Sequence, residues 1–269
     1  MNDDQLPRFE RPPVIEAVLG VQFGRIAGFS AAHAGRFWAQ SLPQPWEKVR
    51  EAPRIDDFRE HFGPERQLAR RGLRLTEGVE PNRIQLITSD RMLQVQDSRL
   101  IYNWIKTSDS DKYPTYSELL PAFLSHWEAF QRFASESGLG ALDPNQWEVT
   151  YVNHVPRGAL WESPEDWPLI VKDAWLPPSR VSTMRFDGMQ TEWRFVLDKE
   201  VGRLRMSLQH GRSEGGKGGE VLSLQLVARG PVDADHELLA GMNEGHRSIV
   251  TCFAEMTSER AHAAWGRTR

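Results

Sequence analysis

Several strand-like stretches precede each of two long helical patterns in the sequence, and this order constrains the fold more than any other feature. The clearer helical pattern covers 116–135, with Ser117 as its expected N-cap. Apolar residues recur there at spacings of three and four and form one broad stripe, which consists of Leu119, Leu120, Phe123, Leu124, Trp127, Phe130 and Phe133. A helix with such a stripe must bury it against another layer, so we expect it to cover a sheet made by neighbouring strands.

Strand patterns lie on both sides of this helix. The first covers 14–23, where β-branched residues follow two prolines, and a short helix is expected over 30–41 with Ser30 as its N-cap. Residues 47–70 are charged and irregular. Further strand patterns cover 73–78, 83–89, 92–104, 146–155, 181–186, 192–197, 202–209 and 221–229. Within 92–104, Asp97-Ser98 supplies a turn, so this stretch is either two short strands or one strand broken by a bulge. The second helical pattern runs from Asp235 to about Trp265.

The two sets of elements follow a similar order, which indicates an internal duplication. The first repeat would cover 1–140 and the second 141–269, and their opening strands carry Glu16 and Glu148 at like positions, 132 residues apart. We therefore predict an α+β fold of two similar halves, each an antiparallel sheet packed by a long helix. The two sheets could instead join, which would give one pseudo-symmetric domain.

Composition narrows the class of protein. The 269 residues include one cysteine, Cys252, so no intrachain disulfide is possible, a reducing cytoplasm fits best, and the thiol is expected to be structural. The net charge of −4 and the scattered basic residues give no concentrated positive excess, so we expect no nucleic-acid or membrane partner. The start of the chain is acidic and lacks the apolar core of a signal peptide, and apolar runs are far shorter than the ~18 residues of a membrane span.

Several stretches of the sequence carry a resemblance. They are Phe9–Phe23 (FERPPVIEAVLGVQF), the block Leu93–Gln96 followed by Tyr102-Asn103-Trp104 and Tyr113–Tyr116, and Glu148–Asn153 (EVTYVN), with which Phe253 to Gly266 is consistent. On these motifs, and over nearly its whole length, the chain resembles a sporadically distributed bacterial family of uncharacterised proteins. The resemblance implies genes scattered as on mobile or defence islands. It implies no reaction and transfers no catalytic residues.

Two stretches approach known motifs without carrying their chemistry. Residues 211–218 approach a phosphate-binding loop, but Gly218 stands where the magnesium-binding hydroxyl belongs, and strand patterns flank the stretch on both sides. His236-Glu237 begins a zinc motif, but Ala240 stands where the second histidine belongs. We therefore expect neither a cofactor nor a metal.

Glu16 and Glu148 are the acids of most interest, because each lies within an apolar strand where an unpaired carboxylate is costly. Each could form a salt bridge or face solvent. Alternatively, the two could form a pseudo-symmetric pair in a groove and do acid–base work. Four polar side chains could line a ligand pocket with them, or could pin loops through buried hydrogen bonds: Gln94, Asn103, Asn153 and His154.

Three tryptophans, Trp161, Trp167 and Trp175, lie in a proline-rich insertion, where large rings form either a cover over the sheet or a recognition surface. Because no catalytic motif is intact, we lean away from an enzyme. We expect a non-catalytic protein-binding module that uses this loop, as a component of a mobile defence or toxin–antitoxin-like system. A homodimer is also compatible with the sequence. The alternative is a small-ligand pocket protein, or a weak hydrolase that uses Glu16 and Glu148.

Overall fold

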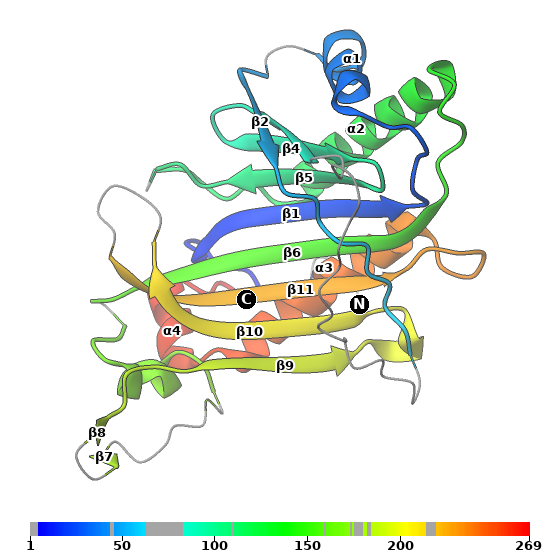
Figure 1. Ribbon diagram of the computed structural model, residues 1–269. Coiled ribbons are helices and arrows are strands. Elements are labelled where there is room, and N and C mark those ends of the chain that lie inside the picture. Colours follow the sequence, from blue (N-terminus) through cyan, green and yellow to red (C-terminus); the bar gives the residue numbers. More distant parts are fainter. Residues whose placement is uncertain are drawn as a thin grey trace.

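Nine antiparallel strands form one large sheet in the computed structural model (Figure 1). The structure describes residues 5–43, 46–62, 83–108, 110–158, 160–172, 174, 180–181, 184–213 and 219–269. In their order across the sheet, the strands are β2 (Lys48–Ala52), β3 (Arg83–Ile87), β4 (Arg91–Gln96), β5 (Arg99–Ile105), β1 (Val14–Phe23), β6 (Pro144–Pro156), β11 (Glu220–Pro231), β10 (Arg203–Arg212) and β9 (Gln190–Val196). With the helices described next, the fold is α+β, as expected.

Two long helices cover one face of this sheet. α2 (Tyr116–Glu136) packs on β5 and β1, whereas α3 (Leu238–Met256) packs on β6, β11 and β10 (Figure 1). The expected stripe of α2 is largely buried, with only Leu120 and Leu124 partly exposed. α1 (Ala31–Ser41) packs on α2, and α4 (Glu259–Trp265) follows α3. None of the helices in the described residues combines the length and apolar character needed to cross a membrane.

One tryptophan determines how closely α3 approaches the sheet. Trp147 of β6 is 0% exposed, and glycines surround its indole ring. A Cβ atom added at Gly241 of α3 would lie 2.2 Å from its Nε1, and one at Gly245 would lie 2.5 Å from its Cζ3. On the neighbouring strand β11, where Gly230 pairs with Trp147, a Cβ atom at Gly230 would lie 2.6 Å from Cζ2 of the same ring. The glycines are therefore needed because the ring occupies the space of their missing side chains.

Three strand expectations are refined by the structure. The charged stretch 47–70 was expected to be irregular, but its first residues form the edge strand β2, which pairs with β3. The expected strand at 181–186 is a separate short hairpin of β7 (Arg180–Val181) and β8 (Met184–Arg185). The expected strand at 73–78 lies outside the described residues.

Two helix expectations are also corrected. The N-cap of α2 is Thr115 rather than Ser117, because Thr115 forms a capping box with Glu118, three residues into the helix. The second helical pattern is not one helix, since it ends at Met256 and starts again as α4. Ser258 begins α4 by accepting a hydrogen bond from the backbone of Ala261 at 3.1 Å.

The strands of residues 1–140 and 141–269 meet at β1 and β6, so both stretches contribute to one sheet. In that pairing Val18 lies opposite Thr150. Glu16 lies two residues before Val18, and Glu148 lies two residues before Thr150. A two-fold axis that passes between Val18 and Thr150, perpendicular to the sheet, would therefore superpose Glu16 on Glu148. The similarity of the two halves stays a prediction, for which this register is a geometrical argument.

Candidate functional site

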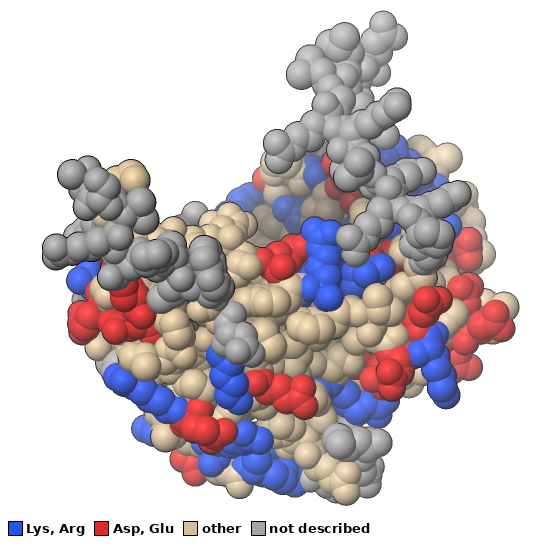
Figure 2. Space-filling view, turned by 90° about the horizontal axis from the view of Figure 1, so that it is seen from below, with Lys and Arg blue, Asp and Glu red and all other residues tan. Residues whose placement is uncertain are grey.

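We call the sheet surface that faces away from α2 and α3 the open face. Strand residues alternate between the two faces, so Ala17, Leu19 and Val21 of β1 enter the core and Glu16 and Gln22 belong to the open face. Figure 2 views the molecule from the β9 edge of the sheet, with the open face toward the top. The face carries many buried polar side chains: Gln22, Gln85, Gln94, Gln96, Arg99, Asn103, Gln146 and Thr150. Their hydrogen-bond partners define the candidate site.

A row of hydrogen bonds crosses five strands of the open face and ends on Glu16. Arg50 of β2 donates to Gln85 Oε1, and Gln85 Nε2 donates to Gln94 Oε1, both at 2.8 Å. Gln94 Nε2 donates to Asn103 Oδ1 at 2.8 Å, and Asn103 Nδ2 donates to Glu16 Oε1 at 2.6 Å. The row thus joins two predicted pocket residues, Gln94 and Asn103, to one predicted acid. It fixes the orientation of every amide in it.

Glu16 is partly exposed, and among the described residues no cation lies within salt-bridge distance of its carboxylate. Burial raises the pKa of Glu16 above its ordinary value, and the hydrogen bond from Asn103 offsets only part of that effect. One oxygen accepts from Asn103, and no described residue donates to the other. As far as the described residues show, the carboxylate therefore has a free acceptor position on the open face.

Glu148 differs from Glu16 because two arginines hold it. Arg229 Nε donates to its Oε2 at 2.7 Å, and Arg99 NH1 lies 3.4 Å from the same oxygen. Burial alone would raise the pKa of Glu148, but the guanidinium groups of Arg229 and Arg99 outweigh it and hold this pKa below its ordinary value. The structure therefore places the two predicted acids on one face but gives them opposite electrostatic settings.

A segment without regular structure, which we call the strap (residues 53–62), crosses one end of the open face (Figure 1). Polar side chains of the sheet hold its backbone: Gln96 exchanges two hydrogen bonds with Ile55, at 3.0 and 2.8 Å. Gln22 accepts from the Phe58 amide at 3.2 Å. Gln146 of β6 accepts from the backbone amide of Glu60 at 2.8 Å. The strap is thus attached mainly by polar contacts.

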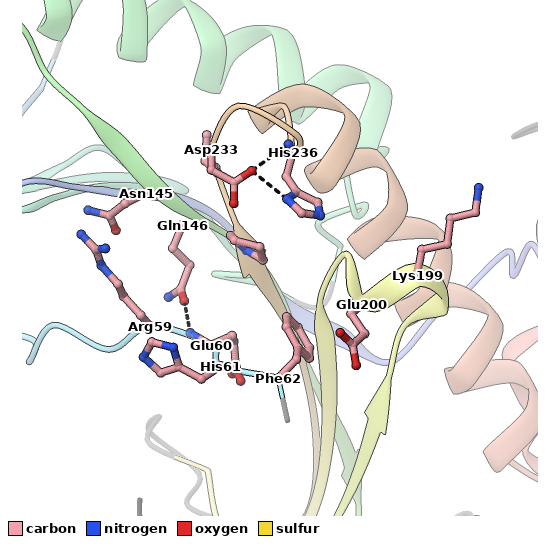
Figure 3. Close-up of a pocket in the computed structure, with 12 residues that line it drawn as sticks. Arg59, Glu60, His61, Phe62, Asn145, Gln146, Lys199, Glu200, Asp233 and His236 are labelled. Carbon is pink, nitrogen blue, oxygen red and sulfur yellow. Dashed lines mark hydrogen bonds and ion pairs between the residues drawn. The ribbon is translucent and has the colours of Figure 1, made fainter. Parts of the chain in front are cut away.

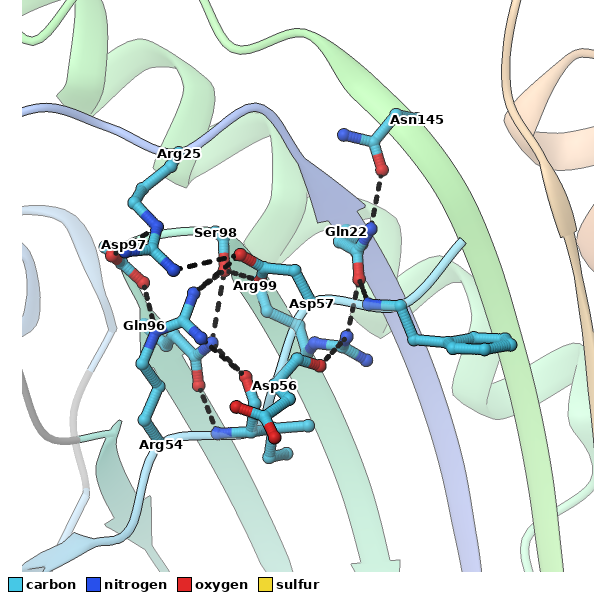
Figure 4. A network of polar contacts seen from close by, with 12 residues as sticks. Gln22, Arg25, Arg54, Asp56, Asp57, Gln96, Asp97, Ser98, Arg99 and Asn145 are labelled. Carbon is cyan, nitrogen blue, oxygen red and sulfur yellow. Dashed lines mark hydrogen bonds and ion pairs between the residues drawn. The ribbon is translucent and has the colours of Figure 1, made fainter. Parts of the chain in front are cut away.

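Ion pairs fix the first part of the strap to the β4–β5 turn. Arg54 binds Asp57 of the strap at 2.7 Å and Asp97 of the turn at 3.3 Å (Figure 4). Asp57 also accepts from the Ser98 hydroxyl at 2.6 Å. Burial alone would raise the pKa of Asp57, but the Ser98 hydroxyl and the Arg54 guanidinium contribute to a net lowering of this pKa. Arg99 connects the strap to Glu148: it donates to Gln22 Oε1 at 2.6 Å and to the backbone oxygen of Asp56 in the strap at 3.2 Å, and it lies 3.4 Å from the Glu148 carboxylate.

The far end of the strap forms one wall of an open pocket of about 460 Å³ (Figure 3). The buried carboxylate of Glu60 is held there by Arg203 at 3.1 Å and by Arg205. Asp233 and His236 form the opposite wall, joined by a 2.8 Å contact, and Asp233 also accepts from the backbone of the turn before α3. Lys199 is in the left-handed backbone region, with a φ of 55°, and its side chain points away from the other labelled residues in Figure 3.

No group of His, Cys, Asp and Glu side chains that could hold a metal ion occurs in the described part of the chain. The lone thiol is not activated either, because burial raises the pKa of Cys252 to about 11. The predicted pocket residue His154 lies on the open face, and burial lowers its pKa. Asn153 faces the opposite way and is buried, donating to the backbone of Leu224 at 3.1 Å. It is therefore separated from the other pocket candidates.

The tryptophan loop, which is the proline-rich insertion of residues 157–178, buries the tryptophans of its described part. Trp161 is 2% exposed and Trp167 is 0% exposed, and their rings pack edge to face at 6.2 Å. Trp161 donates to the backbone oxygen of Val155 at 2.9 Å, which fastens the loop to β6. The burial of these two rings fits the first of the two expected alternatives, a cover, and the role of the loop in partner binding stays a prediction. Trp175 lies outside the described residues.

Sequence reasoning missed the arginines and the strap. Arg99, Arg229 and Glu60 gave no local signal, because each acquires its role from a partner far away in the chain. The glutamines did leave a signal: Gln22 and Gln85 interrupt apolar strand patterns at positions that face the same side. No protein-family model matches the chain, and no curated protein matches it.

Proposed function

We propose that this chain is a non-catalytic protein-binding module that binds its partner on the open face, with Glu16 receiving a lysine or arginine side chain of the partner. The single observation that carries the proposal is the carboxylate of Glu16, which is oriented by Asn103, has a free oxygen, and has no cation among the described residues. The open face replaces the tryptophan loop as the expected recognition surface.

The chemistry of Glu16 favours a cationic group. The partly buried carboxylate of Glu16 loses hydration and gains only the hydrogen bond from Asn103 in return, which is why burial still raises its pKa. A guanidinium or ammonium group that binds the free oxygen would restore that loss through a charge-assisted hydrogen bond. Because the amide row already fixes the side chain, little conformational entropy is lost on binding.

The surroundings of Glu16 suit a protein segment. Val152 of β6 lies directly opposite Glu16, and Gln225 of β11 lies opposite Val152, so an apolar and a polar side chain flank the carboxylate. Val152 is partly exposed and Gln225 is exposed. An extended segment with one basic residue could use all three. The setting in a mobile defence or toxin–antitoxin-like system belongs to the same proposal and rests on the family resemblance alone.

The test is selection from a random peptide library on immobilised protein. We expect peptides enriched in lysine or arginine at one position on the unaltered chain, and loss of that enrichment on Glu16→Gln. The matched control is Glu162→Gln, which neutralises an exposed carboxylate in the tryptophan loop and should leave the enrichment unchanged. Equal enrichment on Glu16→Gln, or no enrichment on the unaltered chain, would overturn the proposal.

The alternative, a small-ligand site with weak hydrolase activity, has one observation in its favour. Glu16 and His154 lie on neighbouring strands of the open face, and burial shifts the pKa of each toward its neutral form. A neutral carboxylic acid and a neutral imidazole are the forms that donate and accept a proton in acid–base catalysis. Hydrolysis of activated esters that Glu16→Gln abolishes and Glu162→Gln keeps would favour this function.

A further inference from the structure

The sheet ends at β9, which pairs with β10 on one side and with no other described strand. Its seven residues leave a row of backbone donors and acceptors along the outer edge. Apolar surface accompanies this edge, since Phe195 is 38% exposed and Val196 is 52% exposed. An open edge of this kind pairs readily with another strand unless its charges prevent it.

The charges of β9 permit one symmetric pairing. Glu192 and Arg194 are exposed and lie on the same side of the strand, with Trp193 between them on the other side. If two copies of β9 run antiparallel with Trp193 opposite Trp193, each Glu192 lies opposite an Arg194 of the other copy. Within one copy the same two side chains form an ion pair, so pairing across the axis uses groups that already lie at the edge.

Other registers of the same edge are disfavoured. A shift that keeps the side chains on their faces moves the strand by two residues, and it places either Glu192 opposite Glu192 or Arg194 opposite Arg194. The edge strand at the other end of the sheet, β2, lacks this property, because a fully overlapping pair would set Arg50 against Arg50. Along the edge seen in Figure 2, positive and negative groups are interspersed rather than gathered in patches of one sign.

We propose that the chain forms a symmetric dimer through antiparallel pairing of β9 with β9 of a second copy, with Trp193 at the two-fold axis. The sheet then continues through both copies. A two-fold axis perpendicular to the sheet keeps both open faces on the same side, so a partner with two binding segments would be held at two sites. The dimer does not depend on the function proposed above.

The interface is small, so the dimer should be reversible in the micromolar range. The experiment is sedimentation equilibrium of the full chain from about 1 to about 200 µM, the range in which such interfaces dissociate. We expect a mass that rises from 30.8 kDa toward twice that value. Glu192→Arg and Arg194→Glu should each weaken the dimer by at least about tenfold, because each places like charges opposite each other twice.

An equimolar mixture of Glu192→Arg and Arg194→Glu tests directly whether residues 192 and 194 face each other across the dimer axis. In a mixed dimer every 192–194 contact joins opposite charges again, although neither chain regains its internal ion pair. We expect the mixture to associate at least about tenfold more tightly than either variant alone. The control is Glu128→Arg, a charge reversal on the exposed side of α2. A monomeric unaltered chain, a dimer that neither variant weakens, or a mixture that fails to associate would each overturn the proposal.

Discussion

Replacement of Glu148 by glutamine should destabilise the protein much more than any other single neutralisation of an acid on the open face. Glu148→Gln keeps the shape and removes the charge that two guanidinium groups share. Arg229 is partly exposed and can recover some hydration, whereas the Arg99 side chain is only 5% exposed and cannot. Arg99 would then stay buried beside another positive charge.

The magnitude follows from this burial. Removing one member of a buried ion pair typically costs 3–5 kcal/mol, because an uncompensated charge is left behind. Arg99 keeps two acceptors, Gln22 Oε1 at 2.6 Å and the Asp56 backbone oxygen at 3.2 Å, so the lower end applies. We therefore expect a loss of about 3 kcal/mol in the free energy of unfolding at pH 7. A second change, Arg229→Met, should recover part of that loss by removing the repulsion between the arginines.

Urea unfolding followed by tryptophan fluorescence measures this loss, and its pH dependence gives an independent check. The pKa of Glu148 is lowered in the folded protein, so its contribution is complete above the unfolded value of about 4.3 and disappears as the pH falls through the folded value. The difference between the unaltered chain and Glu148→Gln should shrink over that acid range. A loss below about 1 kcal/mol at pH 7, the size of an exposed pair, would refute the assignment of a buried ion triad.

Four further substitutions have expected outcomes. Glu16→Gln should raise the free energy of unfolding more at pH 7 than at pH 4, since the raised pKa of Glu16 means that its ionised form is the one the fold disfavours; urea titrations at both pH values measure this. Gly241→Ala should lower the free energy of unfolding by about 1–3 kcal/mol, because the added methyl group clashes with Trp147. Gly35→Ala in α1, where an added Cβ atom would meet no atom within 4 Å, should raise the free energy of unfolding by about 0.5–1 kcal/mol; thermal unfolding measures both changes. Glu60→Gln should release the end of the strap from two arginines and speed tryptic cleavage within it, seen by mass spectrometry; an unchanged cleavage rate would contradict the role of this ion pair.

The parts of the fold that could be predicted are those whose signal is local. The apolar stripe of α2 expresses which side of the helix is buried, and the turn residues Asp97-Ser98 mark where one strand ends and the next begins; both are confirmed. The break between α3 and α4 was missed because the apolar pattern continues through it, while the cap at Ser258 depends on one hydroxyl. The strap could not be predicted, because its residues have no periodicity and its partners are distant in the chain.

The candidate site shows the same division in a sharper form. The sequence marks Glu16 and Glu148 equally, since each is an acid in an apolar strand. Their difference arises from the strands paired beside them: β11 brings Arg229 opposite Glu148, whereas β5 brings Ile105 opposite Glu16. A register of this kind is a long-range property, and no local pattern contains it.

The arrangement of layers also limits what the open face can bind. The helices already bury the apolar side of the sheet. On the other side the polar groups bind one another, since a row of amides ends at Glu16 and arginines neutralise Glu148. An apolar ligand would have to displace those hydrogen bonds without replacing them, which costs about 1–3 kcal/mol for each buried group left unpaired. A partner that donates to the free oxygen of Glu16 displaces none of them. In the function proposed above, the face would therefore select hydrogen-bonding, cationic groups, and Glu16 is the position at which exchanging a single oxygen for an amide nitrogen would remove that selectivity.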